Sequence, residues 1–163
     1  MTTMTLRSPS QHVSPRAKAY WTVRALCAWL VFVALQLIVW FSSSHPGAWH
    51  PILMTVTVLV ALAHLSVMPQ WRYRVHRWEA TDTAVYTQSG WFSQERRIAP
   101  VSRIQTVDTQ RGPFEQLFGL ANVTVTTASA AGPLKIHGLG REIAEALVEE
   151  LTVRTQSAGG DGT

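Results

Sequence analysis

Two long apolar runs lie close together near the beginning of the chain. The first covers residues 20–41, where Gln36 is the only strongly polar residue after Ala25, and the second covers residues 49–68. An α-helix needs about 20 apolar residues to cross the hydrocarbon core of a membrane, and each run meets that length. The pattern predicts two transmembrane helices, and Pro69 favours an end of the second helix just before it.

The link between the two runs, residues 42–48, is short enough to force the helices into an antiparallel hairpin. It contains no Lys or Arg. Basic residues flank the hairpin on its outer sides: Arg7, Arg16 and Lys18 before the first run with Arg24 near its start, and Arg72, Arg74 and Arg77 after the second. Because Lys and Arg gather on the cytoplasmic side, both flanks are expected in the cytoplasm and the link outside. The long polar leader argues against a cleaved signal peptide, so we expect a multi-pass plasma-membrane protein.

Short segments rich in β-branched and aromatic residues follow the second run. The predicted strands are residues 72–80, 84–88, 91–98, 104–110, 122–127 and 134–137. Ser89 and Gly90 are expected to form a hairpin turn, Pro100 interrupts the pattern, and residues 128–133 are expected to form a turn of small residues. The strand at 122–127 alternates strictly between apolar and polar positions, which is typical of a sheet with one buried face.

An amphipathic helix is predicted near the C-terminus. Its apolar stripe recurs at steps of three and four residues and consists of Ile143, Ala144, Leu147, Val148 and Leu151. Glu150 and Arg154 stand one turn apart and can pair. The Gly-Leu-Gly string at 138–140 is expected to form the turn before this helix. It is not a dinucleotide-binding loop, because Ile143 replaces the third glycine. Several strands followed by one helix indicate a strongly bent sheet that the helix plugs at one end.

The same pattern divides the chain into four segments. Residues 1–18 are expected to be a disordered cytoplasmic N-terminus, because they are rich in Ser, Thr and Pro. Residues 19–69 form the predicted transmembrane hairpin, and residues 70–156 form one cytoplasmic domain. Residues 157–163, rich in Gly, Ser and Asp, are expected to be a disordered tail.

Charge and composition narrow the function classes. The chain carries a net charge of +4. Many of its bases flank the apolar runs and no nucleic-acid motif accompanies them, so no nucleic-acid partner is expected. The single cysteine, Cys27, excludes an intrachain disulfide and a cysteine-based zinc site. No clustered carboxylates and no arrangement of serine, histidine and acid point to catalysis, so we expect no enzyme, no cofactor and no metal.

The histidines of the apolar runs and their link leave two interpretations open. His64 lies deep in the second run, where it can be a neutral imidazole hydrogen-bonded to the other helix, or a proton or metal site. We favour the hydrogen bond, because neither run contains a carboxylate that would partner a charged ring. His45 and His50 lie close together at the link, but two histidines without a third ligand are a weak metal signal.

A continuous motif links the sequence to a known family. Residues 98–107 read IAPVSRIQTV and residues 109–127 read TQRGPFEQLFGLANVTVTT. With its proline, Arg-Ile-Gln, Gln-x-x-Pro and Phe-Gly-Leu-Ala, the chain over residues 20–153 resembles the bacterial pleckstrin-homology family of YdbS-like membrane proteins. It departs at Gln116, where the family often has arginine, and at 127–129, where Thr-Ala-Ser replaces the usual Thr-Ala-Gly.

The resemblance implies both a fold and a function. The implied fold is an α+β membrane protein, in which a two-helix transmembrane hairpin precedes a pleckstrin-homology-like bent β-sheet or barrel capped by a C-terminal helix. The implied function is a non-catalytic interaction or assembly module, since such proteins often occur with a larger membrane protein that carries several copies of the domain. The same resemblance is also compatible with a homo-oligomer. The alternatives are a sensor of anionic lipid headgroups and a subunit of a transporter or enzyme complex.

Candidate contact residues lie within the motif and just before it. The expected partner-binding residues are Arg103, Gln105, Gln110, Gly112, Pro113, Phe114, Phe118 and Gly119, and the candidate headgroup-binding residues are Arg96 and Arg97. Arg103 and Gln105 are expected on one strand face. Phe114, Leu117 and Phe118 are expected on one short helical turn, where core packing is favoured over an exposed binding loop.

Overall fold

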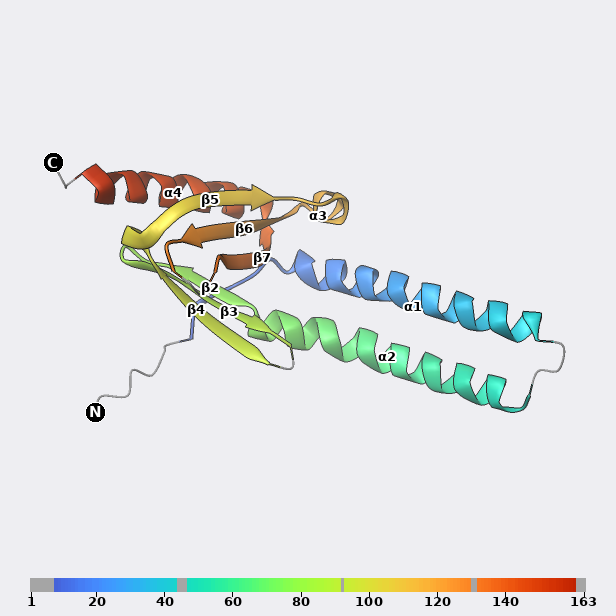
Figure 1. The fold of residues 1–163 in the computed structure, drawn as a ribbon. Coiled ribbons are helices and arrows are strands. Elements are labelled where there is room, and N and C mark those ends of the chain that lie inside the picture. Colours follow the sequence, from blue (N-terminus) through green and yellow to red (C-terminus); the bar gives the residue numbers. More distant parts are fainter. Residues whose placement is uncertain (1–7, 44–46, 92, 130–131, 161–163) are drawn as a thin grey trace, which may run out of the picture.

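The computed structural model describes residues 8–43, 47–91, 93–129 and 132–160. Two long helices, α1 (Arg16–Ser42) and α2 (Trp49–Val75), run antiparallel and project from a β-rich domain (Figure 1). Most of their apolar side chains face outward, and Ile38 and Leu59, for example, are 60% and 61% exposed. A surface of this kind is stable in lipid rather than in water, which agrees with the predicted transmembrane hairpin.

Helix α2 does not end at Pro69, so the predicted boundary is wrong. The helix continues to Val75. Pro69 removes one backbone hydrogen-bond donor, but tertiary packing holds the turns after it, because Val75 is buried and Tyr73 packs against the core. The strand expected at 72–80 is therefore reduced to β2 (Arg77–Ala80).

The described part of the N-terminus is folded, contrary to the expectation for residues 1–18. Strand β1 (Gln11–His12) pairs antiparallel with β2, and the side chain of Val13 is only 3% exposed. Helix α1 then begins at Arg16, earlier than predicted. Contacts with the domain, which local composition does not reveal, order this segment. Residues 1–7 lie outside the described residues.

The first sheet has the strand order β1-β2-β3-β4. Its later elements are β3 (Ala84–Gly90), β4 (Gln94–Pro100) and the 3-10 turn η1 (Val101–Arg103) that follows them. The predicted hairpin is present, but Ser89 and Gly90 belong to β3 and pair with Glu95 and Gln94, so the turn expected at Ser89-Gly90 is wrong. The interruption predicted at Pro100 is confirmed, since β4 ends there.

The second sheet has the order β5-β6-β7. Its elements are β5 (Ile104–Gln110), the short helix α3 (Pro113–Leu117), β6 (Leu120–Thr127) and β7 (Leu134–Gly140). The strand predicted at 104–110 is confirmed at both of its ends. The string at 138–140 belongs to β7 and not to a turn, so that expectation is wrong. The turn predicted at 128–133 lies partly outside the described residues.

Helix α4 (Arg141–Gly160) lies along the second sheet (Figure 1). Ala144, Leu147 and Leu151 are buried and Val148 packs beside them, as predicted. Ile143 is 51% exposed, so its assignment to the stripe is wrong. The buried positions already follow the spacing i, i+3, i+4, i+7, and residue 143 lies at the margin of that face.

The end of α4 extends further than expected. The predicted pair of Glu150 and Arg154 is confirmed at 2.6 Å, and Arg154 also donates to the carbonyl oxygen of Thr81 at 2.6 Å. The helix continues through the predicted tail as far as Gly160. Residues 161–163 lie outside the described residues. The predicted arrangement of a helical hairpin, antiparallel sheets and a C-terminal helix is confirmed.

The hydrophobic core of the domain includes the first turns of α1. Ala17, Tyr20 and Trp21 are buried in the same cluster as the residues of both sheets and α4. Gly138 of β7 has a φ of +77°, and a Cβ atom added to it would lie 3.1 Å from the Cβ of Ala17. The absence of a side chain at Gly138 therefore lets α1 pack closely against β7.

We predict that Gly138→Ala destabilises the protein more than Gly132→Ala does. Both glycines have a φ of +77°, so both alanines carry the same backbone strain. An added Cβ at Gly132 meets no atom within 4 Å, whereas at Gly138 it meets α1. The extra loss for Gly138→Ala should be about 1 kcal/mol or more, measured by chemical unfolding in detergent. Equal losses in the two variants would contradict close packing of α1 on the sheet.

Candidate functional site

Helix α3 is a single turn whose two ends the sequence defines. Gly112 is the N-terminal cap in extended conformation, and Pro113 occupies the first helical position, where its missing N–H costs nothing. Gly119 follows with a φ of +64°, a left-handed conformation that ends the turn. The Arg111 guanidinium donates from Nε to the carbonyl oxygen of Leu120 at 3.2 Å and so closes the loop.

A hydrogen-bonded group of side chains attaches α3 to the membrane helix α1. The Tyr20 hydroxyl donates to Glu115 Oε1 at 2.9 Å, and Asn122 Nδ2 of β6 donates to the same oxygen at 3.3 Å. Arg24, one turn further along α1, donates to the Tyr20 hydroxyl oxygen at 3.3 Å. Asn122 also accepts the backbone N–H of Gly138 at 3.0 Å. These bonds fix α3 relative to α1, β6 and β7.

The carboxylate of Glu115 is the charged centre of this group. Burial raises its pKa, but the hydrogen bonds that it accepts from its own backbone N–H, from Tyr20 and from Asn122, together with the charge of Arg24, lower the pKa by more. The net shift is downward from 4.5. Glu115 therefore stays ionised and holds its donors in place under neutral conditions.

The apolar residues of this turn divide between the core and the surface. Phe118 packs against the core and meets the Tyr20 ring edge-on, with 6.2 Å between ring centroids. Phe114 is 45% exposed and Leu117 is 77% exposed. The favoured interpretation of the motif, core packing, is right for Phe118 and wrong for the other two. Phe114 and Leu117 form an outward-facing pair, which we call the α3 apolar pair.

The remaining predicted partner-binding residues do not gather into one site. Arg103 lies in η1, not in a strand, and Gln105 lies at a register shift between its neighbours in β5. The strand face expected to carry both residues is therefore absent. Gln110, at the other end of β5, opposes Asn122 and leads toward α3. Because a strand rises about 3.3 Å per residue, Arg103 and Gln105 lie well away from α3.

Strand β5 is an edge of the second sheet. Among the described strands it pairs only with β6. Gln105, Thr109 and Gln110 are exposed along it. An edge strand presents unpaired backbone groups on its outer side and can accept another extended segment. The β5 edge and the α3 apolar pair are continuous along the chain.

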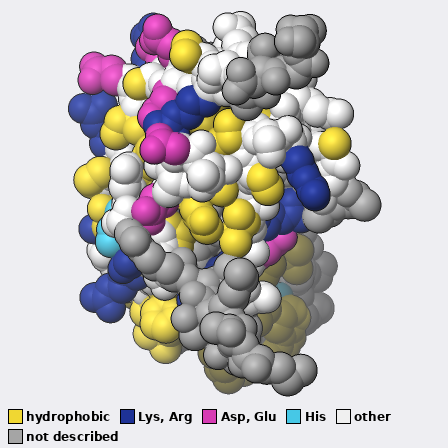
Figure 2. Space-filling model, turned by 90° about the vertical axis from the view of Figure 1, so that its left-hand side faces the viewer, with side chains coloured by type: hydrophobic (Ala, Val, Ile, Leu, Met, Phe, Trp, Pro, Cys, Tyr) yellow, Lys and Arg dark blue, Asp and Glu magenta, His cyan; other side chains and the backbone are white. Residues whose placement is uncertain are grey.

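The two candidate headgroup residues lie on β4. Arg97 is engaged within the domain, because it donates to Glu95 at 2.6 Å and to the carbonyl oxygen of Pro133 at 2.7 Å. Arg96 is exposed and opposes Gln88 in the register. The end of the domain remote from the hairpin shows acidic and basic side chains close together (Figure 2).

His64 makes the contact that the sequence favoured. Its Nδ1 accepts a hydrogen bond from Trp29 Nε1 of α1 at 3.0 Å. No group of three or more metal-ligating side chains occurs among the described residues, and His45 lies outside them. Trp91, at the turn between β3 and β4, lies 5.8 Å from the His64 ring, and its carbonyl oxygen accepts from Trp71. The sequence analysis did not predict this contact between the domain and α2. The feature that could have indicated it is an aromatic residue at the turn of a predicted hairpin.

The helical hairpin and the bent, helix-capped sheets define a membrane-anchored protein with a pleckstrin-homology-like domain. The family model described as Bacterial PH domain matches residues 17–155, and the chain belongs to that family. The chain is similar to the transmembrane protein YdbS of Bacillus subtilis (strain 168), with 30% identity over 127 residues, which cover 74% of this chain and 78% of that protein. No solved structure matches the chain.

The match to the family includes the hairpin as well as the sheets, since it begins within α1. It therefore agrees with the structure, in which the first turns of α1 belong to the domain core. The resemblance drawn from the motif is confirmed. The family is not a known class of enzyme.

We predict that Tyr20→Phe destabilises the protein by about 1 kcal/mol at neutral pH, because it removes one hydrogen bond to a carboxylate. Tyr86→Phe is the matched control, since no hydrogen bond of the Tyr86 hydroxyl occurs among the described residues. The folded-state pKa of Glu115 is lowered, so the stability that it contributes is present above about pH 4.5 and is lost as the pH falls.

The difference in unfolding free energy between the parent and Tyr20→Phe should accordingly shrink as the pH falls below 4.5. Urea unfolding in detergent at pH 7 and pH 4 measures both values. A constant difference across this range would show that Tyr20 does not act through the carboxylate.

Proposed function

We propose that this protein is a non-catalytic, membrane-anchored assembly module whose domain binds other membrane proteins. The observation that carries the proposal is the α3 apolar pair, in which Leu117 is 77% exposed on a turn that is rigidly attached to a membrane helix. Exposed apolar side chains on a rigid support are typical anchors of protein interfaces. The charge pattern of the flanks supports a cytoplasmic position for the domain and both termini.

The hydrogen bonds that hold helix α3 in place favour a role of the α3 apolar pair in binding a partner. Glu115, between Phe114 and Leu117 in the chain, is held by donors from α1 and β6. A partner would therefore meet a preformed surface and would lose little conformational freedom in ordering it. The adjoining β5 edge offers backbone groups for pairing with a strand of the partner.

The partner that fits best is a second membrane protein with a domain of the same kind. Its domain would be held at the same height above the bilayer, which raises the effective concentration of one surface near the other. The family resemblance supports a larger protein with several such domains, and a second copy of this chain offers the same surfaces.

A sensor of anionic lipid headgroups is the second candidate. The contact of Trp91 with His64 of α2 brings the β3–β4 hairpin, which carries Arg96, close to the membrane helices and so favours it. Arg97 supports it less, because binding a phosphate would compete with its bonds to Glu95 and Pro133.

The test places a photoreactive phenylalanine analogue at position 117 of the full-length protein in native membranes. Val153 of α4 is the matched control position, since it is 60% exposed and apolar but distant in the chain from α3. We expect position 117, and not position 153, to crosslink to a membrane protein that contains a pleckstrin-homology-like domain, identified by mass spectrometry. Leu117→Asp, with the photoreactive residue at 114, should reduce that crosslink at least tenfold, while Val153→Asp should not.

Crosslinks from position 117 to lipid alone would overturn the assembly proposal. In that case binding of the protein to vesicles with and without anionic lipid, at low and high salt, separates headgroup recognition from simple insertion. A charge at Phe118 would be a poor test, because Phe118 packs against the core and its replacement would also destabilise the domain.

A further inference from the structure

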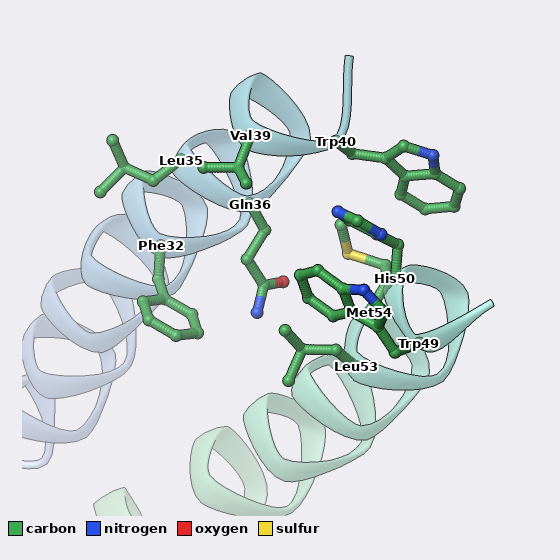
Figure 3. Close-up of a pocket in the computed structure, with 9 residues that line it drawn as sticks. All are labelled: Phe32, Leu35, Gln36, Val39, Trp40, Trp49, His50, Leu53 and Met54. Carbon is green, nitrogen blue, oxygen red and sulfur yellow. The ribbon is translucent and has the colours of Figure 1, made fainter. Parts of the chain in front are cut away.

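A pocket lies between α1 and α2 at the end of the hairpin that carries the link. Its volume is about 260 Å³. Apolar and aromatic side chains make most of its wall, among them Phe32, Trp40, Trp49 and Leu53. Figure 3 shows the Gln36 side chain reaching from α1 into this space, with Trp49, His50 and Leu53 of α2 opposite. Trp40 lies near the end of α1 and Trp49 begins α2, and tryptophans at the ends of transmembrane helices typically lie at the level of the lipid headgroups.

Two buried polar atoms of this pocket have no hydrogen-bond partner. Gln36 donates through Nε2 to Thr57 Oγ1 at 2.8 Å, which leaves its Oε1 unpartnered. His50 is only 7% exposed, and its Nδ1 lies 3.2 Å from the carbonyl oxygen of Gly47. Because a carbonyl oxygen can only accept, Nδ1 of the neutral ring carries the hydrogen. The unpartnered His50 Nε2 is then also an acceptor.

We propose that this pocket binds the donor-bearing headgroup end of a membrane lipid, with the primary ammonium of an ethanolamine-type headgroup as the matching chemistry. An ammonium offers three N–H donors, and Gln36 Oε1 and His50 Nε2 are two acceptors that lack them. Trp40 and Trp49 also line the pocket, and tryptophan rings attract cations. The apolar wall formed by residues such as Leu35 and Leu53 suits the adjoining hydrocarbon.

A lipid fits this pocket better than a helix of another protein. Close helix packing in membranes uses small residues, because they let two backbones approach. The walls here are large side chains, including Phe32, Trp40 and Met54. A volume of about 260 Å³ is also below the usual range for a complete drug-sized ligand, but it is sufficient for a headgroup and the beginning of a chain.

The test uses two lipids whose headgroups carry the same charge, one with N–H donors and one with three N-methyl groups in their place. Full-length protein is exchanged into micelles containing equal amounts of phosphatidylethanolamine and phosphatidylcholine with the same acyl chains. The choline headgroup has the same charge but no N–H. Native mass spectrometry then measures which lipid the protein retains. We expect about a fivefold preference for phosphatidylethanolamine, which corresponds to one hydrogen bond.

Three variants make the assignment specific. His50→Phe keeps an aromatic ring beside Trp49 but removes the acceptor, and Gln36→Leu removes the other acceptor, so each should abolish the preference. Thr57→Val breaks the bond to Gln36 without removing either unpartnered acceptor. This variant should therefore keep the preference for phosphatidylethanolamine. The thermal midpoint of each variant in phosphatidylcholine alone reports whether it is folded.

Equal retention of the two lipids by the parent would overturn the proposal. The proposal would also be overturned if the folded His50→Phe and Gln36→Leu variants kept the preference for phosphatidylethanolamine. Retention of a second protein chain in place of lipid, lost in these two variants, would show that a partner helix occupies the pocket instead. A preference that both acceptor variants lose and Thr57→Val keeps would establish the lipid site.

Discussion

The packing of the first turns of α1 into the domain core is the contact on which the rest of the structure depends. Ala17 is fully buried. The Arg72 guanidinium lies over the Trp21 ring, 4.7 Å from its centroid, and the His76 ring lies tilted beside Trp21. One helix therefore provides both a membrane span and part of a water-soluble core. Two units joined by a flexible linker would move independently, whereas a shared core holds the domain in one orientation to the bilayer.

This orientation brings two parts of the domain near the membrane helices. Helix α3 is attached to α1 through Tyr20 and Glu115, and the β3–β4 turn meets α2 through Trp91 and His64. The sheets supply the rigid frame, while these connections supply the contacts with the hairpin. Both proposed roles of the domain, assembly and headgroup contact, follow from the same placement.

Polar side chains inside the hairpin hold its helices together along their length. Trp29 donates to His64 near the domain, and Gln36 donates to Thr57 further along. Interhelical hydrogen bonds of this kind contribute about 0.6 to 2 kcal/mol each, since the alternative is a polar group exposed to hydrocarbon. At the link end the hydrogen bonding of the hairpin is incomplete, because Gln36 and His50 each keep one unsatisfied acceptor. These unsatisfied acceptors make this end a candidate binding site, whereas the Trp29–His64 bond is a structural contact.

Features that depend on neighbours along the chain could be predicted from the sequence. The two apolar runs, the strand at 104–110, the short turn after Pro113 and the stripe of α4 follow from periodicity and turn chemistry. The tertiary structure decided where several other elements end and which of the remaining apolar side chains are buried. Burial of Val75 carries α2 past Pro69, and pairing with β2 orders Gln11. Phe118 packs against the core, whereas Leu117 is exposed. These outcomes depend on contacts between segments that are distant in the chain, and local pattern cannot contain that information.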